Sequence, residues 1–121
     1  MWTWSQSEGK LYRDGQWVAD GYAGMGEGVN NPDMQHVQMV GPLPQGRYTI
    51  GSLRKDGRHM GPFVMFLDPD SANEMYGRSA FYIHGDNGKG DNSASNGCII
   101  LPRAIRFLIA ESGDNQLEVT V

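Results

Sequence analysis

The chain has 121 residues, which allows one domain with a substantial hydrophobic core, and we expect a single domain over residues 1–121. Its formal net charge of −4 is spread along the sequence without a Lys/Arg cluster, which argues against nucleic acid or an anionic membrane as the main partner. The sequence has no apolar run of about 18 residues, so no membrane insertion is expected. No signal peptide is expected either, because the basic and apolar regions of such a segment are absent.

Short alternating segments at the start of the chain predict an antiparallel β meander. Seventeen glycines and few helical patterns indicate a mainly β protein with many tight turns. Glu8-Gly9 and Asp14-Gly15 separate the alternating segments, and Asp-Gly is among the most favourable two-residue hairpin turns. The predicted strands of this meander are residues 2–7, 10–13 and 16–19.

The middle of the chain combines a long loop with two further predicted strands. Residues 21–38 show neither the period of a strand nor that of a helix, and we interpret most of them as an ordered surface loop. Residues 42–50 are typical of a proline-fixed turn that leads into a strand, and residues 62–67 are typical of another strand. Ser71 and Glu74 have the spacing of a capping box, which predicts one short helical turn.

The C-terminal part predicts the only longer helix, over residues 102–112, followed by a strand over residues 116–121. Pro102 suits the first helical turn, and Gly113 suits the C-cap. The helical spacing predicts a buried apolar face and an opposite polar face. The buried face would hold Leu101, Ile105, Leu108 and Ile109, and the polar face Arg103, Arg106 and Glu111.

Cys98, with His84 upstream of it, forms the most informative pair in the sequence. A thiol and an imidazole are the minimum set for a cysteine nucleophile and its base. Strand-like residues precede His84 and follow Cys98, which predicts that both side chains lie at strand ends. A lone cysteine is more often a small buried residue, but the polar, glycine-containing turn before Cys98 favours a nucleophile.

The neighbours of this pair indicate how a catalytic site would be completed. The carbonyl of Gly85 can accept the Nδ1 proton of His84, which leaves Nε2 to take the thiol proton. Asp86 is the alternative orienting group. Successive backbone N–H groups around Asn96 and Gly97 can form an oxyanion hole.

The sequence predicts neither a metal site nor a dinucleotide site. The three histidines, His36, His59 and His84, are scattered and lack the paired spacing of zinc ligands. The loop at residues 86–92 has glycines where a calcium-binding loop needs oxygen ligands. No helical pattern follows the glycines of residues 24–28, so these glycines do not form a dinucleotide fingerprint.

Several motifs together resemble a known family. His84-Gly85, the segment Ser95-Asn96-Gly97-Cys98-Ile99 and the upstream residues 42–50 are similar to the YkuD-type L,D-transpeptidase catalytic domain. Segments spread over nearly the whole chain resemble its short branch, the type VI secretion L,D-transpeptidase effector family. These segments are residues 24–28, 31–34, 40–46, 77–79 and 95–102.

The resemblance implies a fold, an activity and partners. The fold would be a YkuD-like β-sandwich of two packed sheets. Cys98 would attack the carbonyl between diaminopimelate and the terminal D-Ala of a peptidoglycan stem tetrapeptide, with His84 as base and no cofactor. Hydrolysis would give L,D-carboxypeptidase activity, and an amine acceptor would give exchange or cross-linking. The protein would be an exported, monomeric antibacterial toxin that acts in the periplasm of a target bacterium, with an immunity protein in the producing cell.

Some residues depart from the pattern of the family. Housekeeping members usually have Arg or Asn near the position of Ile100, which cannot bind a carboxylate. Arg78 or Arg103 is therefore expected to bind a substrate carboxylate, with a solvated surface arginine as the alternative for each. Further residues expected at the substrate are Ser95, Tyr82 and Met34.

Two other functions remain open from the sequence. A papain-like cell-wall peptidase is disfavoured, because such enzymes usually place the cysteine before the histidine. A non-catalytic β module that binds glycans or proteins through Trp and Tyr side chains is the alternative from another class.

Overall fold

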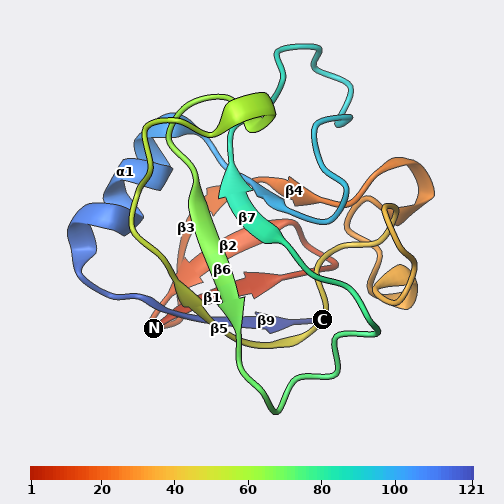
Figure 1. The fold of residues 1–121 in the computed structure, drawn as a ribbon. Coiled ribbons are helices and arrows are strands. Elements are labelled where there is room, and N and C mark those ends of the chain that lie inside the picture. Colours follow the sequence, from red (N-terminus) through yellow and green to blue (C-terminus); the bar gives the residue numbers. More distant parts are fainter.

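The computed structural model describes residues 1–121 as nine strands, one α-helix and three 3₁₀ turns (Figure 1), which confirms the prediction of a mainly β fold. The strands are β1 (Trp2–Ser5), β2 (Lys10–Arg13), β3 (Gln16–Asp20), β4 (Tyr22–Ala23), β5 (Gly46–Ile50), β6 (Met65–Pro69), β7 (Phe81–His84), β8 (Ile99–Ile100) and β9 (Gln116–Thr120). The helix is α1 (Arg103–Ser112), and the 3₁₀ turns are η1 (Gly26–Gly28), η2 (Pro32–Met34) and η3 (Arg58–Met60).

All nine strands belong to one hydrogen-bonded series, in the order β3-β2-β1-β9-β5-β6-β7-β8-β4. This single sheet replaces the two separate sheets that the sequence analysis expected. The reason is that β9 pairs with β1 on one side and with β5 on the other, and so joins the two halves. The sheet curls around the core until it is nearly closed (Figure 1), as strongly twisted sheets of many strands do.

The N-terminal meander forms as predicted. β1 pairs antiparallel with β2, and β2 pairs antiparallel with β3. Asp14 and Gly15 adopt positive φ angles of 49° and 83°, as a type I′ hairpin turn requires. The indole rings of Trp2 and Trp4 lie on the same face of β1, and both belong to a core cluster of 17 buried residues. Burial of a large apolar side chain contributes about 1.5–3 kcal/mol, so these rings anchor the meander to the rest of the sheet.

The short helical turn predicted from Ser71 and Glu74 is absent. Asp70 instead forms the turn, because its Oδ1 accepts from the backbone N–H of Ala72 and its carbonyl accepts from Asn73. The side chain of Asn73 then accepts from the N–H of Arg47 at 3.0 Å and donates to the carbonyl of Arg47 at 2.8 Å. This tertiary contact with the start of β5 holds the segment in a non-helical path.

Helix α1 begins one residue later than predicted and ends at the predicted cap, where Gly113 adopts a left-handed φ of 73°. Its buried face differs from the predicted face. Ile109 is buried as expected, but Leu108 is 45% exposed and Arg106 is buried. Arg106 turns inward because its guanidinium donates to the carbonyls of Pro62 and Phe63, at 2.9 and 2.7 Å, which lack partners in a regular element.

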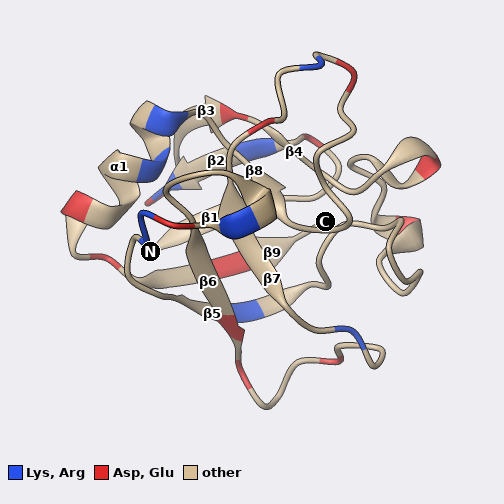
Figure 2. Cartoon of the chain, turned by 45° about the horizontal axis from the view of Figure 1, so that its top comes forward, with Lys and Arg blue, Asp and Glu red and all other residues tan.

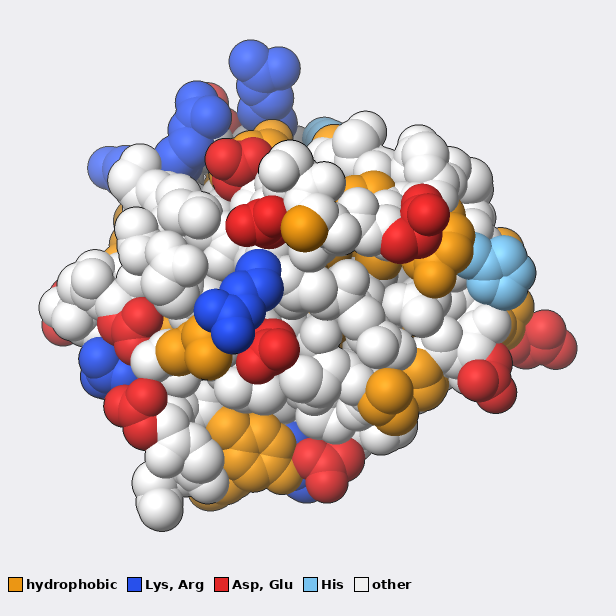
Figure 3. Space-filling model, turned by 90° about the horizontal axis from the view of Figure 1, so that it is seen from below, with side chains coloured by type: hydrophobic (Ala, Val, Ile, Leu, Met, Phe, Trp, Pro, Cys, Tyr) orange, Lys and Arg blue, Asp and Glu red, His pale blue; other side chains and the backbone are white.

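Charges of both signs are distributed over strands, loops and α1 (Figure 2). On the face in Figure 3, acidic, basic and hydrophobic side chains are interspersed, without a large patch of one kind. No helix in the structure is both long and apolar enough to cross a membrane.

Substitutions at two adjacent helix positions test the rotation of α1. Ile109→Ala is expected to lower the free energy of unfolding by about 2–4 kcal/mol, because it leaves a cavity in the core. Leu108→Ala is expected to change it by less than about 0.5 kcal/mol, because Leu108 faces solvent. Urea denaturation followed by circular dichroism measures both, and equal losses for the two variants would contradict the observed orientation.

Candidate active site

The pairing of β7 with β8 brings the two candidate catalytic residues together. The strands are parallel, with Ile83 opposite Ile99 and His84 opposite Ile100. Cys98 immediately precedes β8 and lies beside Tyr82, whose backbone N–H donates to Sγ at 3.3 Å. Because side chains alternate along strands, the buried isoleucines Ile83 and Ile99 face the core, whereas Cys98, Tyr82 and His84 share the opposite face. The predicted location at strand ends is therefore confirmed.

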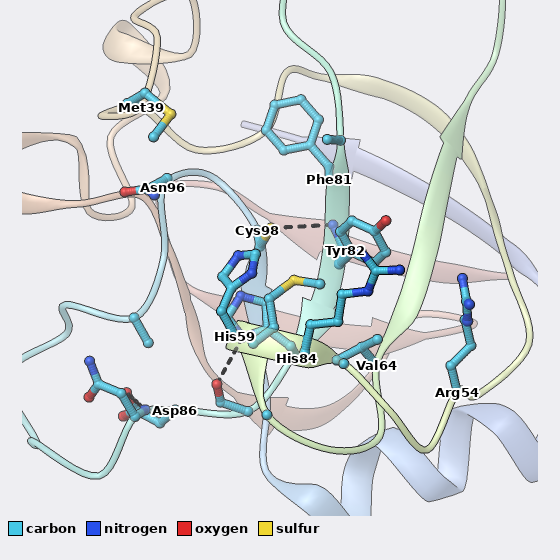
Figure 4. A pocket seen from close by; sticks show the side chains of 18 of the residues that line it. Met39, Arg54, His59, Val64, Phe81, Tyr82, His84, Asp86, Asn96 and Cys98 are labelled. Atoms are coloured by element: carbon cyan, nitrogen blue, oxygen red, sulfur yellow. Dashed lines mark hydrogen bonds between the residues drawn. The ribbon is translucent and has the colours of Figure 1, made fainter.

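This opposite face forms the floor of a cleft of about 740 Å³. Cys98 and His84 both line the cleft, together with Tyr82 and Gly85, and Figure 4 shows the two catalytic candidates near its centre. Cys98 is a half-buried residue that lines the cleft, so it is not sealed in the core. A substrate that enters the cleft can thus reach both the thiol and the imidazole.

His84 is held in one tautomer by its neighbour. Its Nδ1 lies 2.9 Å from the carbonyl oxygen of Gly85, and a carbonyl can only accept, so Nδ1 carries the proton. The other nitrogen, Nε2, is then free to accept a proton. Burial lowers the pKa of His84, the hydrogen bond to Gly85 offsets part of this effect, and Arg106 and His59 lower the pKa further. The imidazole is therefore neutral near pH 7, as a general base must be.

Gly85 also meets a steric requirement. A Cβ atom at this position would lie 2.7 Å from Nη2 of Arg106, which is closer than real contacts allow. A glycine at position 85 therefore lets this guanidinium approach the backbone closely.

The thiol of Cys98 is a neutral group at rest. Burial raises the pKa of Cys98, and the N–H of Tyr82 and the positive charge of Arg78 offset only part of this effect. A neutral thiol beside a neutral imidazole favours proton transfer during attack over a preformed thiolate.

Ser95 shapes the turn before Cys98 and does not face the cleft. Its side chain is fully buried, and its Oγ donates to the carbonyl of Cys98 at 2.6 Å. The same oxygen accepts from the N–H groups of Gly24 and Gly97, at 2.9 and 3.0 Å. A hydroxyl has one donor and two acceptor positions, so no position remains for a substrate. The expected substrate contact of Ser95 is therefore wrong, and Ser95 positions the nucleophile loop instead.

The predicted oxyanion hole needs a related correction. The N–H of Gly97 is occupied by Ser95, so it cannot bind an oxyanion. The N–H groups of Asn96 and Cys98 donate to no other residue, although that of Cys98 lies near its own thiol, and both residues line the cleft. These two groups are the donors that remain for an oxyanion.

Arg78 is neither a surface arginine nor a free carboxylate ligand. It is 5% exposed, and its guanidinium donates to four carbonyls, of Gln35, Gly41, Pro42 and Asn96, over distances of 2.6 to 3.1 Å. It also lies over the ring of Phe81, 5.0 Å from its centroid. These hydrogen bonds connect the loop of residues 35–42 to Asn96 in the loop before Cys98, and we assign Arg78 a structural role.

Arg103 and Met34 lie outside the cleft. The guanidinium of Arg103 is exposed and stacks on Phe63 and Phe107, at 4.4 and 5.5 Å from the ring centroids. Met34 belongs to η2, and Met39 from the same long loop lines the cleft in its place. Neither residue lines this cleft, whereas Tyr82 does, so the substrate contacts expected of Arg103 and Met34 find no support in its geometry and stay predictions.

Sequence reasoning missed the wall of the cleft formed by residues 54–61. Arg54, Arg58 and His59 from this segment line the cleft. In the sequence they form only a polar stretch between two strands, far from both catalytic candidates. Their arrival at the cleft depends on how β6 pairs with β7, which no local pattern indicates. The His, Cys, Asp and Glu side chains form no group of three or more suited to a metal ion.

A pair of arginine substitutions tests the structural role of Arg78. Arg78→Lys is expected to lower the free energy of unfolding by about 2 kcal/mol or more, because one ammonium cannot reach all four buried carbonyls. Arg103→Lys is expected to change it by less than about 0.5 kcal/mol. Urea denaturation measures both. Unchanged stability of Arg78→Lys with weakened substrate binding would instead support the substrate contact expected from the sequence.

Comparison with known proteins adds the family. A search of curated proteins finds no match. A family model described as the Tlde1 domain matches residues 18–121, a range that includes both catalytic candidates and every residue that lines the cleft. The chain therefore belongs to the Tlde1 domain family, a family of type VI secretion effectors.

Proposed function

We propose that this protein is a cysteine L,D-transpeptidase/L,D-carboxypeptidase that acts on the tetrapeptide stems of peptidoglycan. The observation that carries the proposal is the placement of Cys98 and His84 on one face of paired strands, in a shared cleft, with Nε2 of His84 free. A non-catalytic module would not need a partly exposed thiol beside an imidazole fixed in its basic tautomer. The motif resemblance of residues 95–102 supplies the substrate class.

The first half of the reaction transfers the stem to the enzyme. Nε2 of His84 takes the thiol proton while Sγ of Cys98 attacks the carbonyl carbon between diaminopimelate and D-Ala. The negative charge that develops on the carbonyl oxygen is stabilised by the N–H groups of Cys98 and Asn96. The C–N bond then breaks, the imidazolium returns its proton to the leaving amine, and D-Ala departs. The stem remains as a thioester on Cys98.

The second half decides the product. A water molecule that gives a proton to His84 attacks the thioester, releases the thiol and leaves a tripeptide stem. The amine of a D-amino acid can attack in the same way, which gives exchange. Housekeeping members of the family that the motifs resemble usually have a longer loop between the base and the nucleophile. The loop between His84 and Cys98 thus leaves less wall for a second stem, and we favour trimming or exchange over cross-linking.

Membership in an effector family supports a role outside the producing cell. Peptidoglycan lies in the periplasm of a target bacterium, so we propose that the protein is delivered there and removes donor stems from the wall. An immunity protein that blocks the cleft would then protect the producer.

Two substitutions test the proposed chemistry. Cys98→Ala is expected to abolish release of D-Ala from a disaccharide tetrapeptide, and His84→Ala is expected to slow it by about 10²–10⁴-fold, the usual contribution of a general base. His36→Ala is the matched control, because His36 is an exposed histidine away from the cleft. Mass spectrometry follows the tripeptide product. Equal product from wild type and Cys98→Ala would refute the role of the thiol.

The pH dependence tests the state of the imidazole. Because burial lowers the pKa of His84 below its ordinary value of 6.5, the base stays neutral and active at pH values where a free histidine is protonated. Activity is expected to fall only as the pH drops through that lowered pKa. The acid limb of kcat/KM, measured between about pH 4 and 8, should lie below pH 6.5. A limb at or above that value is incompatible with a desolvated base.

A further inference from the structure

One wall of the cleft carries positive charges that the protein does not use. Arg54 and Arg58 line the same cleft as Cys98 and are both exposed. The four ion pairs of the protein are formed by Lys10, Arg13 and the N-terminus, so neither cleft arginine has an acidic partner. Both guanidinium groups are thus available to a ligand.

The acidic side chains of the cleft are already engaged. Oδ1 of Asp56 accepts from the backbone N–H of Arg58 at 2.9 Å. Oδ1 of Asp86 accepts from the hydroxyl of Tyr22 at 2.8 Å and from the N–H of Asn87 at 2.9 Å. Neither carboxylate pairs with Arg54 or Arg58, so these two guanidinium groups are the cations of this wall that can bind an anionic group directly.

The segment that carries these cations is held in place. The backbones of Arg54 and Val64 exchange two hydrogen bonds, of 2.8 and 2.9 Å, at its base. Arg58 has a positive φ of 56°, which is uncommon for a residue with a side chain, and its carbonyl accepts from the N–H of Gly61. Arg106 binds the carbonyls of Pro62 and Phe63 from α1. These contacts hold the wall of residues 54–61 in place beside the cleft.

The same segment lies close to the catalytic pair. His59 follows Arg58 in η3 and lines the cleft together with His84. Figure 4 shows His59 next to Cys98 and His84, with Arg54 farther out along the cleft. Arg54 and Arg58 thus both lie on the wall that also carries His59, in the same cleft as the catalytic pair.

We propose that Arg58, assisted by Arg54, binds the free carboxylate of the terminal D-Ala of the donor stem. This inference rests on the proposed function. The carboxylate lies only one residue beyond the scissile carbonyl, and the planar guanidinium fork matches a carboxylate with two parallel hydrogen bonds. Arg58 thus fills the role that the sequence analysis assigned to Arg78 or Arg103. A stem whose D-Ala is already amide-bonded in a cross-link lacks this carboxylate, so the protein would select free stem ends.

The test compares a disaccharide tetrapeptide with the same compound amidated at its C-terminus. Wild type is expected to prefer the free acid by roughly tenfold or more in kcat/KM, because the amide cannot form the charge-assisted hydrogen bond with the guanidinium. Arg58→Ala is expected to lose activity on the free acid and to keep its activity on the amide, so that it acts on both about equally. Arg58→Lys should recover part of the preference for the acid. Lys55→Ala is the matched control, because it removes a positive charge from the same segment at a residue outside the cleft, and it should keep the wild-type preference.

Binding to protein that cannot turn over separates this inference from the proposed function. Calorimetry with Cys98→Ala and with Cys98→Ala/Arg58→Ala measures affinity for the tetrapeptide acid, and the second protein is expected to bind roughly tenfold more weakly. Failure of wild type to release D-Ala would refute the proposed function, while the binding comparison would still decide the role of Arg58. Equal affinity of the two proteins, no binding by either, or an acid preference that survives in Arg58→Ala would overturn the inference.

Discussion

The parallel pairing of β7 with β8 is the constraint on which the candidate site depends. Parallel neighbours need a crossover connection, and here residues 85–98 supply it as a loop without a helix. The register of the pair fixes which residues alternate toward the cleft, and a shift by one residue would turn Cys98 toward the core. The strand ends thus place a thiol and an imidazole on one surface, and the N–H of Tyr82 holds the sulfur there.

Buried polar side chains hold the irregular segments around this pair. Arg78, Ser95 and Arg106 have little or no exposure, and each bonds to backbone groups that no strand or helix satisfies. A buried carbonyl or N–H without a partner is costly, so irregular loops beside a core need such donors and acceptors. One guanidinium can serve several carbonyls at once, which suits Arg78 and Arg106 to this role. The cleft therefore owes its shape to side chains whose polar groups are bonded to the backbone of the protein.

The electrostatics of the cleft fit acyl transfer by a neutral catalytic pair. Burial raises the pKa of Cys98 and lowers the pKa of His84, so the uncharged forms of both are favoured at rest. In the proposed reaction, charge develops only as the proton moves from sulfur to Nε2. In that proposed reaction, the N–H groups of Cys98 and Asn96 and the cations on the wall of residues 54–61 meet the negative charges of the substrate.

The sequence by itself determined the mainly β class, the meander, the C-terminal helix and the pair of Cys98 and His84. Strand alternation, Asp-Gly turns and a cysteine in a polar glycine turn are local signals, and they are readable without tertiary contacts. Tertiary structure decided the single curled sheet, because β9 had to insert between β1 and β5. It also decided the burial of Arg78 and Arg106 and the arrival of Arg58 at the cleft. Those outcomes depend on which distant carbonyls lacked donors and which cations were left unpaired, and only the folded chain brings such groups within reach of one another.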